Sequence, residues 1–126
     1  MKKRLVYIVL LSVAVIGLIG CKKTKEITCN LSTAASKPPV EMTIIYTATQ
    51  TGDGTLSSLS YATISGIVTV QNPSLPWTVT VPALTSTDVA ISATGTTKDG
   101  SLKISYDGVG SGGTISGSDF CEQQTN

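Results

Sequence analysis

The chain has 126 residues, with nine basic and eight acidic side chains, three cysteines and no histidine. This length corresponds to one domain at most. The lack of histidine excludes Ser-His-Asp and Cys-His catalysis and the usual histidine-based zinc sites. The balanced charge leaves no basic stripe for nucleic acid. We therefore expect no metal, no cofactor and no nucleic-acid partner.

Residues 1–20 have the pattern of a signal peptide. Three basic residues at positions 2–4 precede an apolar run from Leu5 to Ile19, which is shorter than the roughly 20 residues that a membrane-spanning helix needs. The run ends in Leu18-Ile19-Gly20-Cys21, which resembles the lipobox of bacterial lipoproteins. The resemblance implies cleavage before Cys21, a lipid on its thiol and acylation of the new N-terminus. The alternative is an uncleaved membrane anchor with an incidental cysteine.

The cleaved chain would run from Cys21 to Asn126, with six lysines against eight acids and hence a side-chain charge of 6 − 8 = −2. Residue 22 is a lysine, whereas aspartate at that position retains enterobacterial lipoproteins in the inner membrane, so this resemblance favours the outer membrane. Residues 21–39 are predicted to form a lipidated tether that ends at Pro38-Pro39. Its lysines either rest on anionic lipid headgroups or lie in a solvated linker.

From residue 40 onward, apolar side chains alternate with Ser and Thr at the period of two that is typical of strands. We expect a β-bulge near Ser57-Ser58, a hairpin turn at Lys98-Asp99-Gly100, and a break at the prolines between the third and fourth strands. The predicted strands are Glu41–Thr49, Thr55–Ala62, Ile64–Gln71, Trp77–Val81, Val89–Thr97, Leu102–Tyr106 and Gly112–Phe120. About seven short strands without helical periodicity predict an all-β domain over residues 40–126, a small immunoglobulin-like antiparallel β-sandwich.

If Cys21 carries lipid, Cys29 and Cys121 remain as a pair that flanks the predicted strands. An even pair in an exported protein usually forms a disulfide. The alternative is a reactive or metal-binding thiol pair.

Four short motifs occur in the order found in MmpS-type domains, and together they cover about residues 42–121. They are Tyr46-Thr47-Ala48-Thr49, Leu75-Pro76-Trp77, Ile91-Ser92-Ala93-Thr94-Gly95 and Ile104-Ser105-Tyr106-Asp107-Gly108. The resemblance implies an immunoglobulin-like sandwich outside a membrane and a role beside MmpL-like exporters of the resistance-nodulation-division (RND) class. The lipobox and the flanking cysteines depart from that family, so the fold carries over better than the exporter role.

Candidate site residues have plain structural explanations. Trp77 is expected to anchor the core or its rim, with ligand stacking as the alternative. Asp53, Asp99 and Asp107 each precede a glycine, which indicates turns, although three carboxylates at one end of a sandwich could bind Ca²⁺. The glycine-rich stretch from Gly108 to Gly117 indicates a flexible hairpin or edge.

No carboxylate lies in an apolar run, and no nucleophile motif is present, so we expect no catalytic residues and no enzyme activity. The leading interpretation is a lipid-anchored envelope protein that presents a binding or assembly module to an envelope protein or polymer. Two alternatives remain open: an accessory subunit of an RND-type exporter, and a periplasmic inhibitor or immunity lipoprotein.

Overall fold

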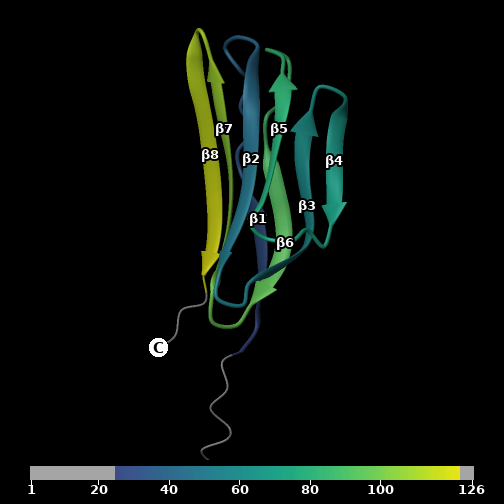
Figure 1. Ribbon diagram of the computed structural model, residues 1–126, viewed down its shortest axis with the longest axis vertical. Helices are drawn as coiled ribbons and strands as arrows, with labels where there is room; N and C mark the ends of the chain where they lie inside the picture. The colour runs from purple at the N-terminus through teal and green to yellow at the C-terminus, as the bar shows by residue number, and fades with distance from the viewer. Residues whose placement is uncertain (1–24, 123–126) are drawn as a thin grey trace, which may run out of the picture.

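The computed structural model of the protein describes residues 25–122. The predicted signal peptide, the lipobox-like sequence and Cys21 therefore lie outside the described residues. The described chain forms two antiparallel four-stranded sheets that pack face to face (Figure 1). The strands are β1 Ile27–Ser32, β2 Met42–Thr51, β3 Thr55–Thr63, β4 Gly66–Gln71, β5 Trp77–Ala83, β6 Ile91–Thr97, β7 Ser101–Gly110 and β8 Gly113–Glu122. The predicted antiparallel β-sandwich is confirmed, with eight strands instead of seven.

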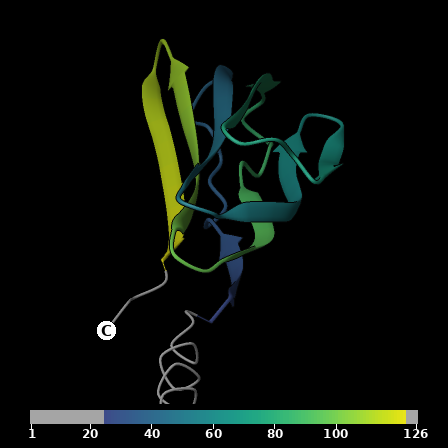
Figure 2. The same ribbon diagram turned by 60° about the horizontal axis from the view of Figure 1, so that its bottom comes forward.

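The strand order is β1-β6-β3-β4 in one sheet and β5-β2-β7-β8 in the other. Only the connections β3–β4 and β7–β8 are hairpins within the described chain, and the other five connections cross between the sheets (Figure 2). Such crossings are typical of Greek-key sandwiches. They bring together strands that are far apart in the sequence, such as β1 with β6 and β2 with β7.

The core follows from the period-two pattern, because alternate side chains of each strand point between the sheets. Its largest side chains are Tyr46 and Tyr106, which pack edge to face with ring centroids 6.4 Å apart. The Tyr46 hydroxyl donates a hydrogen bond to the Ala62 carbonyl at 2.8 Å. Burial raises the pKa of this hydroxyl to about 12, because the phenolate would lose its hydration. The predicted alternation of apolar and polar side chains is confirmed in the two strands that carry Tyr46 and Tyr106, and most of their apolar side chains point inward.

The predicted tether over residues 21–39 contains the strand β1, so the prediction was wrong from Ile27 onward. Cys29 and Leu31 are buried, and β1 pairs with β6 along its whole length. The alternation that marks this strand is short and lies between a lysine cluster and Pro38-Pro39, which are features of linkers. The sandwich therefore begins only six residues after Cys21 in the sequence.

The predicted turns are partly confirmed. The bulge near Ser57-Ser58 is present as a shift in the pairing of β3 with β6 between Leu56 and Ser58. Residues 98–100 do form a turn, but it is not a hairpin, because β6 and β7 belong to different sheets. The turn prediction for Asp107 was wrong, since this residue lies within β7 opposite Ser116 of β8.

The two sheets are covalently joined at one edge by a disulfide between Cys29 of β1 and Cys121 of β8. The backbone N–H of Ser32 also donates to the Asp119 carboxylate at 3.0 Å, which links the same two strands. This edge of the sandwich is therefore closed by a disulfide and a hydrogen bond. The predicted cysteine pairing is confirmed.

Candidate functional site

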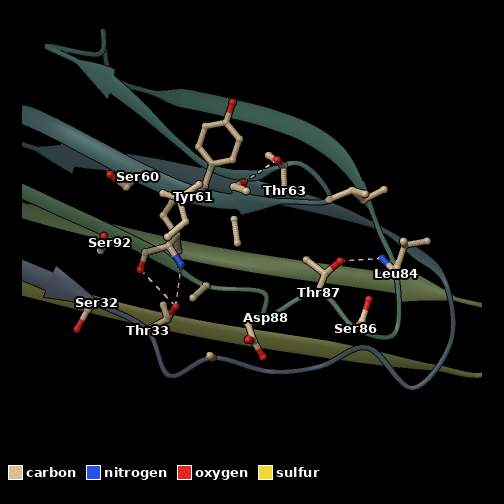
Figure 3. A pocket seen from close by; sticks show the side chains of 17 residues that line it. Ser32, Thr33, Ser60, Tyr61, Thr63, Leu84, Ser86, Thr87, Asp88 and Ser92 are labelled. Atoms are coloured by element: carbon tan, nitrogen blue, oxygen red, sulfur yellow. Dashed lines mark hydrogen bonds between the residues drawn. The ribbon is translucent and has the colours of Figure 1, made fainter.

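A cavity of about 520 Å³ opens on the outer face of the sheet β1-β6-β3-β4. It is bordered by the β3–β4 hairpin and by residues 84–90, which connect β5 to β6 (Figure 3). We call it the hairpin pocket. Its volume falls within the range of about 300–1,000 Å³ that is usual for small-molecule sites. It is the candidate functional site of the described chain.

The floor of the hairpin pocket is a row of serine hydroxyls from three adjacent strands. Ser92 of β6 lies directly opposite Ser32 of β1 on one side and Ser60 of β3 on the other. Figure 3 shows the three side chains in a line across the sheet. Because neighbouring strands are about 4.8 Å apart, the row forms a regular series of hydrogen-bonding groups. Ser60 bonds to Thr69 of β4 at 2.9 Å, and this bond extends the row to the fourth strand.

One wall of the hairpin pocket is the β3–β4 hairpin. The Thr63 hydroxyl donates to the Gly66 carbonyl at 2.7 Å, which fixes the turn at its tip. Ile64 and Ile67 lie on this wall and are 47% and 75% exposed. Large apolar side chains that gather on a surface often mark an interaction site. The wall therefore offers apolar contact beside a polar floor.

The opposite wall, residues 84–90, is held by several hydrogen bonds. The Leu84 N–H donates to the Thr87 hydroxyl, and the Thr87 N–H donates to the Leu84 carbonyl, both at 3.0 Å. Val89 exchanges two backbone hydrogen bonds with Ser36, and the Ala62 N–H donates to the Ala90 carbonyl. This wall is therefore attached to β3 and to the segment after β1. These hydrogen bonds fix the shape of the pocket on this side.

Among the described side chains that line the hairpin pocket, only that of Asp88 is charged. Its carboxylate lies 3.2 Å from the ammonium of Lys37, and both side chains are well exposed. An exposed ion pair of this kind contributes little to stability. It does, however, leave the pocket close to electrically neutral.

The residues singled out in the sequence lie elsewhere. Trp77 is half-buried at the start of β5, where its ring contacts Tyr61 at a centroid distance of 5.4 Å, so it anchors the rim of the core. Asp53 and Asp99 do lie at one end of the sandwich, but the Asp53 carboxylate accepts the Asp99 N–H as part of a turn. Asp107 lies apart from them on β7. Within residues 25–122, no group of three or more Cys, Asp or Glu side chains is placed to hold a metal ion.

Sequence reasoning missed the hairpin pocket because its parts come from separate regions of the chain. Ser60 and Ser92 occupy outward positions in predicted alternating strands, but Ser32 fell in the predicted tether, and the alignment of the three residues depends on which strands pair. Residues 84–88 were assigned no role, and the predicted strand Val89–Thr97 began two residues before β6 does.

Comparisons with protein-family models, with curated protein sequences and with solved structures found no match to this chain. The resemblance to MmpS-type domains therefore stays a prediction from sequence motifs. Among the residues that the structure describes, no helix has the length and apolar character needed to cross a membrane.

Proposed function

We propose that the protein is a lipid-anchored component of a bacterial cell envelope whose β-sandwich acts as a binding module and not as an enzyme. The lipobox Leu18-Ile19-Gly20-Cys21 supplies the anchor in this proposal. Two or three acyl chains on Cys21 would hold the protein stably on a membrane, most simply the outer membrane. The hairpin pocket is the binding site.

The observation that carries the proposal is the short distance along the chain between Cys21 and β1. Six residue steps separate Cys21 from Ile27, so an extended chain could span at most about 20 Å between them. Ile27 pairs with Thr97 at one end of the sheet, whereas Ser32 and Ser92 lie at the other. The chain enters β1 at the Ile27 end, so we expect a lipid on Cys21 to place the turns at residues 51–54 and 97–100 nearer the membrane than the hairpin pocket.

The membrane anchor is tested by expressing the full chain and a Cys21→Ser variant in a bacterium with a lipoprotein-processing pathway. We expect the wild-type chain to begin at Cys21, to carry a diacylglyceryl group and to partition into detergent. The Cys21→Ser variant should keep residues 1–20 and lack the lipid mass. A wild-type chain with an unmodified Cys21 thiol would refute the anchor.

The role of the anchored module is tested by crosslinking the full-length protein in the cells that naturally produce it. The crosslinked partners are then identified by mass spectrometry. An envelope component whose crosslinks map to the hairpin pocket supports the binding-module proposal. Capture of an inner-membrane exporter of the RND class, through another face of the sandwich, would favour the accessory-subunit alternative instead.

A further inference from the structure

We infer that the hairpin pocket binds an uncharged saccharide chain. This inference deepens the proposed function by naming the ligand class. It rests on that function only for the place at which the protein meets the ligand, which is the cell envelope. Three features of the pocket carry it: its electrical neutrality, the arrangement of its hydroxyl groups and the apolar wall beside them.

The electrical neutrality of the pocket selects against ionic ligands. Only Asp88 is charged among the described lining side chains, and its carboxylate pairs with the Lys37 ammonium at 3.2 Å. A phosphate, a carboxylate or a nucleic acid would find no unpaired cation among the described residues that line this site. A ligand with a positive charge would have to compete with Lys37 for Asp88. The pocket therefore favours a neutral molecule that is rich in hydrogen-bonding groups.

The hydroxyl groups of the pocket are available to such a ligand. Those of Ser32, Ser86 and Ser92 form no hydrogen bond to any other described residue. Thr87 is only 8% exposed, and its hydroxyl oxygen accepts the Leu84 N–H, so this residue holds the wall in place and leaves the serine hydroxyls as the groups offered to a ligand.

The apolar wall fits the other half of a sugar. A pyranose ring carries hydroxyls around its rim and C–H groups on its faces. The row Ser32–Ser92–Ser60 can bond to the rim, while Ile64 and Ile67 contact a face. Burying C–H groups against these exposed isoleucines releases water from both surfaces.

The ligand is a chain and not a single sugar, because the polar floor continues beyond the pocket. The next row along the same face of the sheet contains the outward residues Asn30, Thr94, Ser58 and Gln71, each opposite the next in the pairing. These side chains are also uncharged. Alternate residues of a strand are about 6.6 Å apart, so the two rows form a regular grid. A polysaccharide can follow this grid outward from the hairpin pocket.

The test measures binding of the full-length protein in detergent to immobilised oligosaccharides of defined structure. The panel contains neutral oligomers of glucose, mannose, galactose and N-acetylglucosamine, with uronic-acid oligomers as the charged counterpart. We expect at least one neutral oligomer to bind, and longer oligomers to bind more tightly than the dimer. The uronic-acid oligomers should bind at least tenfold more weakly.

Two variants locate the site. Ser92→Lys places a long charged side chain over the middle of the floor and should weaken binding by at least tenfold. Ile67→Ser removes apolar contact at a 75% exposed position, where folding is not affected, and should weaken binding about fivefold. The matched control is Ser118→Lys, which makes the same change at an exposed position of β8 in the other sheet and should leave binding unchanged.

The inference is overturned if no neutral oligomer binds at millimolar concentration, or if the uronic-acid oligomers bind as well as the neutral ones. It is also overturned if Ser118→Lys weakens binding as much as Ser92→Lys. Repeating the measurement with the Cys21→Ser chain separates the two proposals. Saccharide binding by a chain that is never lipidated would sustain this inference alone, whereas a lipidated chain that binds no saccharide would sustain the anchor alone.

Discussion

At the scale of single residues, Asp53 organises the end of the sandwich opposite the hairpin pocket. Its carboxylate accepts hydrogen bonds from the Thr97 hydroxyl and the backbone N–H of Lys98 at 3.0 Å, and from the N–H of Asp99 at 3.1 Å. The bonds to Asp99 and Lys98 are the largest reasons why the pKa of Asp53 lies below its ordinary value of 3.8, because they stabilise the charged form. The sequence predicted both turns at this end but not that one carboxylate joins them.

Replacing Asp53 should reveal this connection. We expect Asp53→Ala to lower the melting temperature at pH 7 by about 4 °C or more, because three donors lose their acceptor. A lowered pKa contributes stability above pH 3.8 that is lost as the pH falls through the folded-state value. Asp53→Asn should therefore lose less stability than the wild type on acidification below pH 3.8. Thermal unfolding followed by circular dichroism from pH 7 to pH 2 measures both effects.

The control for charge alone is Asp107→Asn, at an exposed position of β7. An equal loss of acid sensitivity in Asp53→Asn and Asp107→Asn would mean that the turn contacts are not responsible.

At the scale of secondary-structure elements, the bulge in β3 depends on a glycine in the strand next to it. A Cβ atom on Gly95 of β6 would lie 2.1 Å from the Thr55 carbonyl oxygen and 2.9 Å from a methyl carbon of Leu56. Backbone cannot yield to such a contact without moving β3 away from β6. Glycine at this position therefore allows the two strands to approach where their pairing shifts between Leu56 and Ser58.

We predict that Gly95→Ala destabilises the domain by about 3 kcal/mol, which is the upper part of the range for overpacked cores. The comparison is Thr94→Ala, at the adjacent outward position of the same strand, which should change stability by less than about 0.5 kcal/mol. Urea unfolding monitored by the fluorescence of Trp77 measures both changes. A Gly95→Ala protein as stable as Thr94→Ala would show that β3 and β6 tolerate a wider separation.

The elements also show how far the sequence determines the fold. Alternating residues predicted seven of the eight strands, because one buried face leaves a clear period of two in most of them, although β4 has no buried face. β1 was missed because its six residues lie beside lysines and prolines that suggest a linker. Which strands share a sheet could not be predicted, since β1 pairs with β6 and β2 with β7 across long stretches of sequence. The hairpin pocket was unpredictable for the same reason, whereas the pairing of Cys29 with Cys121 followed from the cysteine count once Cys21 was assigned to a lipid in an exported protein.

At the scale of the whole molecule, the disulfide closes one edge of the sandwich. The loop of chain between its two cysteines contains almost the whole domain. Cys29 and Cys121 are 92 residues apart in the sequence and join β1 of one sheet to β8 of the other. In the chain-entropy model, a loop of this length restricts the unfolded state by about 4–5 kcal/mol. A small domain with few large core side chains gains a large share of its stability from such a link.

We expect reduction of the disulfide, or the paired change Cys29→Ala with Cys121→Ala, to lower the free energy of unfolding by about 4 kcal/mol. Urea denaturation of the oxidised, reduced and doubly substituted proteins measures the difference, and alkylation before mass spectrometry verifies the thiol state of each sample. If reduction lowered the free energy of unfolding by less than about 1 kcal/mol, the two sheets would be held together by packing alone.

At the same scale, the proposed lipid anchor would orient the protein on a membrane. In the proposed anchoring at Cys21, the chain enters the sandwich at the end where β1 begins, and the hairpin pocket lies at the other end of that strand. The most direct test places a fluorophore on a single introduced cysteine, either Lys98→Cys or Ser65→Cys, in the lipidated protein on vesicles that contain spin-labelled headgroups. We predict strong quenching of the probe at residue 98 and weak quenching at residue 65. Equal quenching at the two positions, or stronger quenching at residue 65, would contradict a sandwich anchored at Cys21 with its pocket facing away from the membrane.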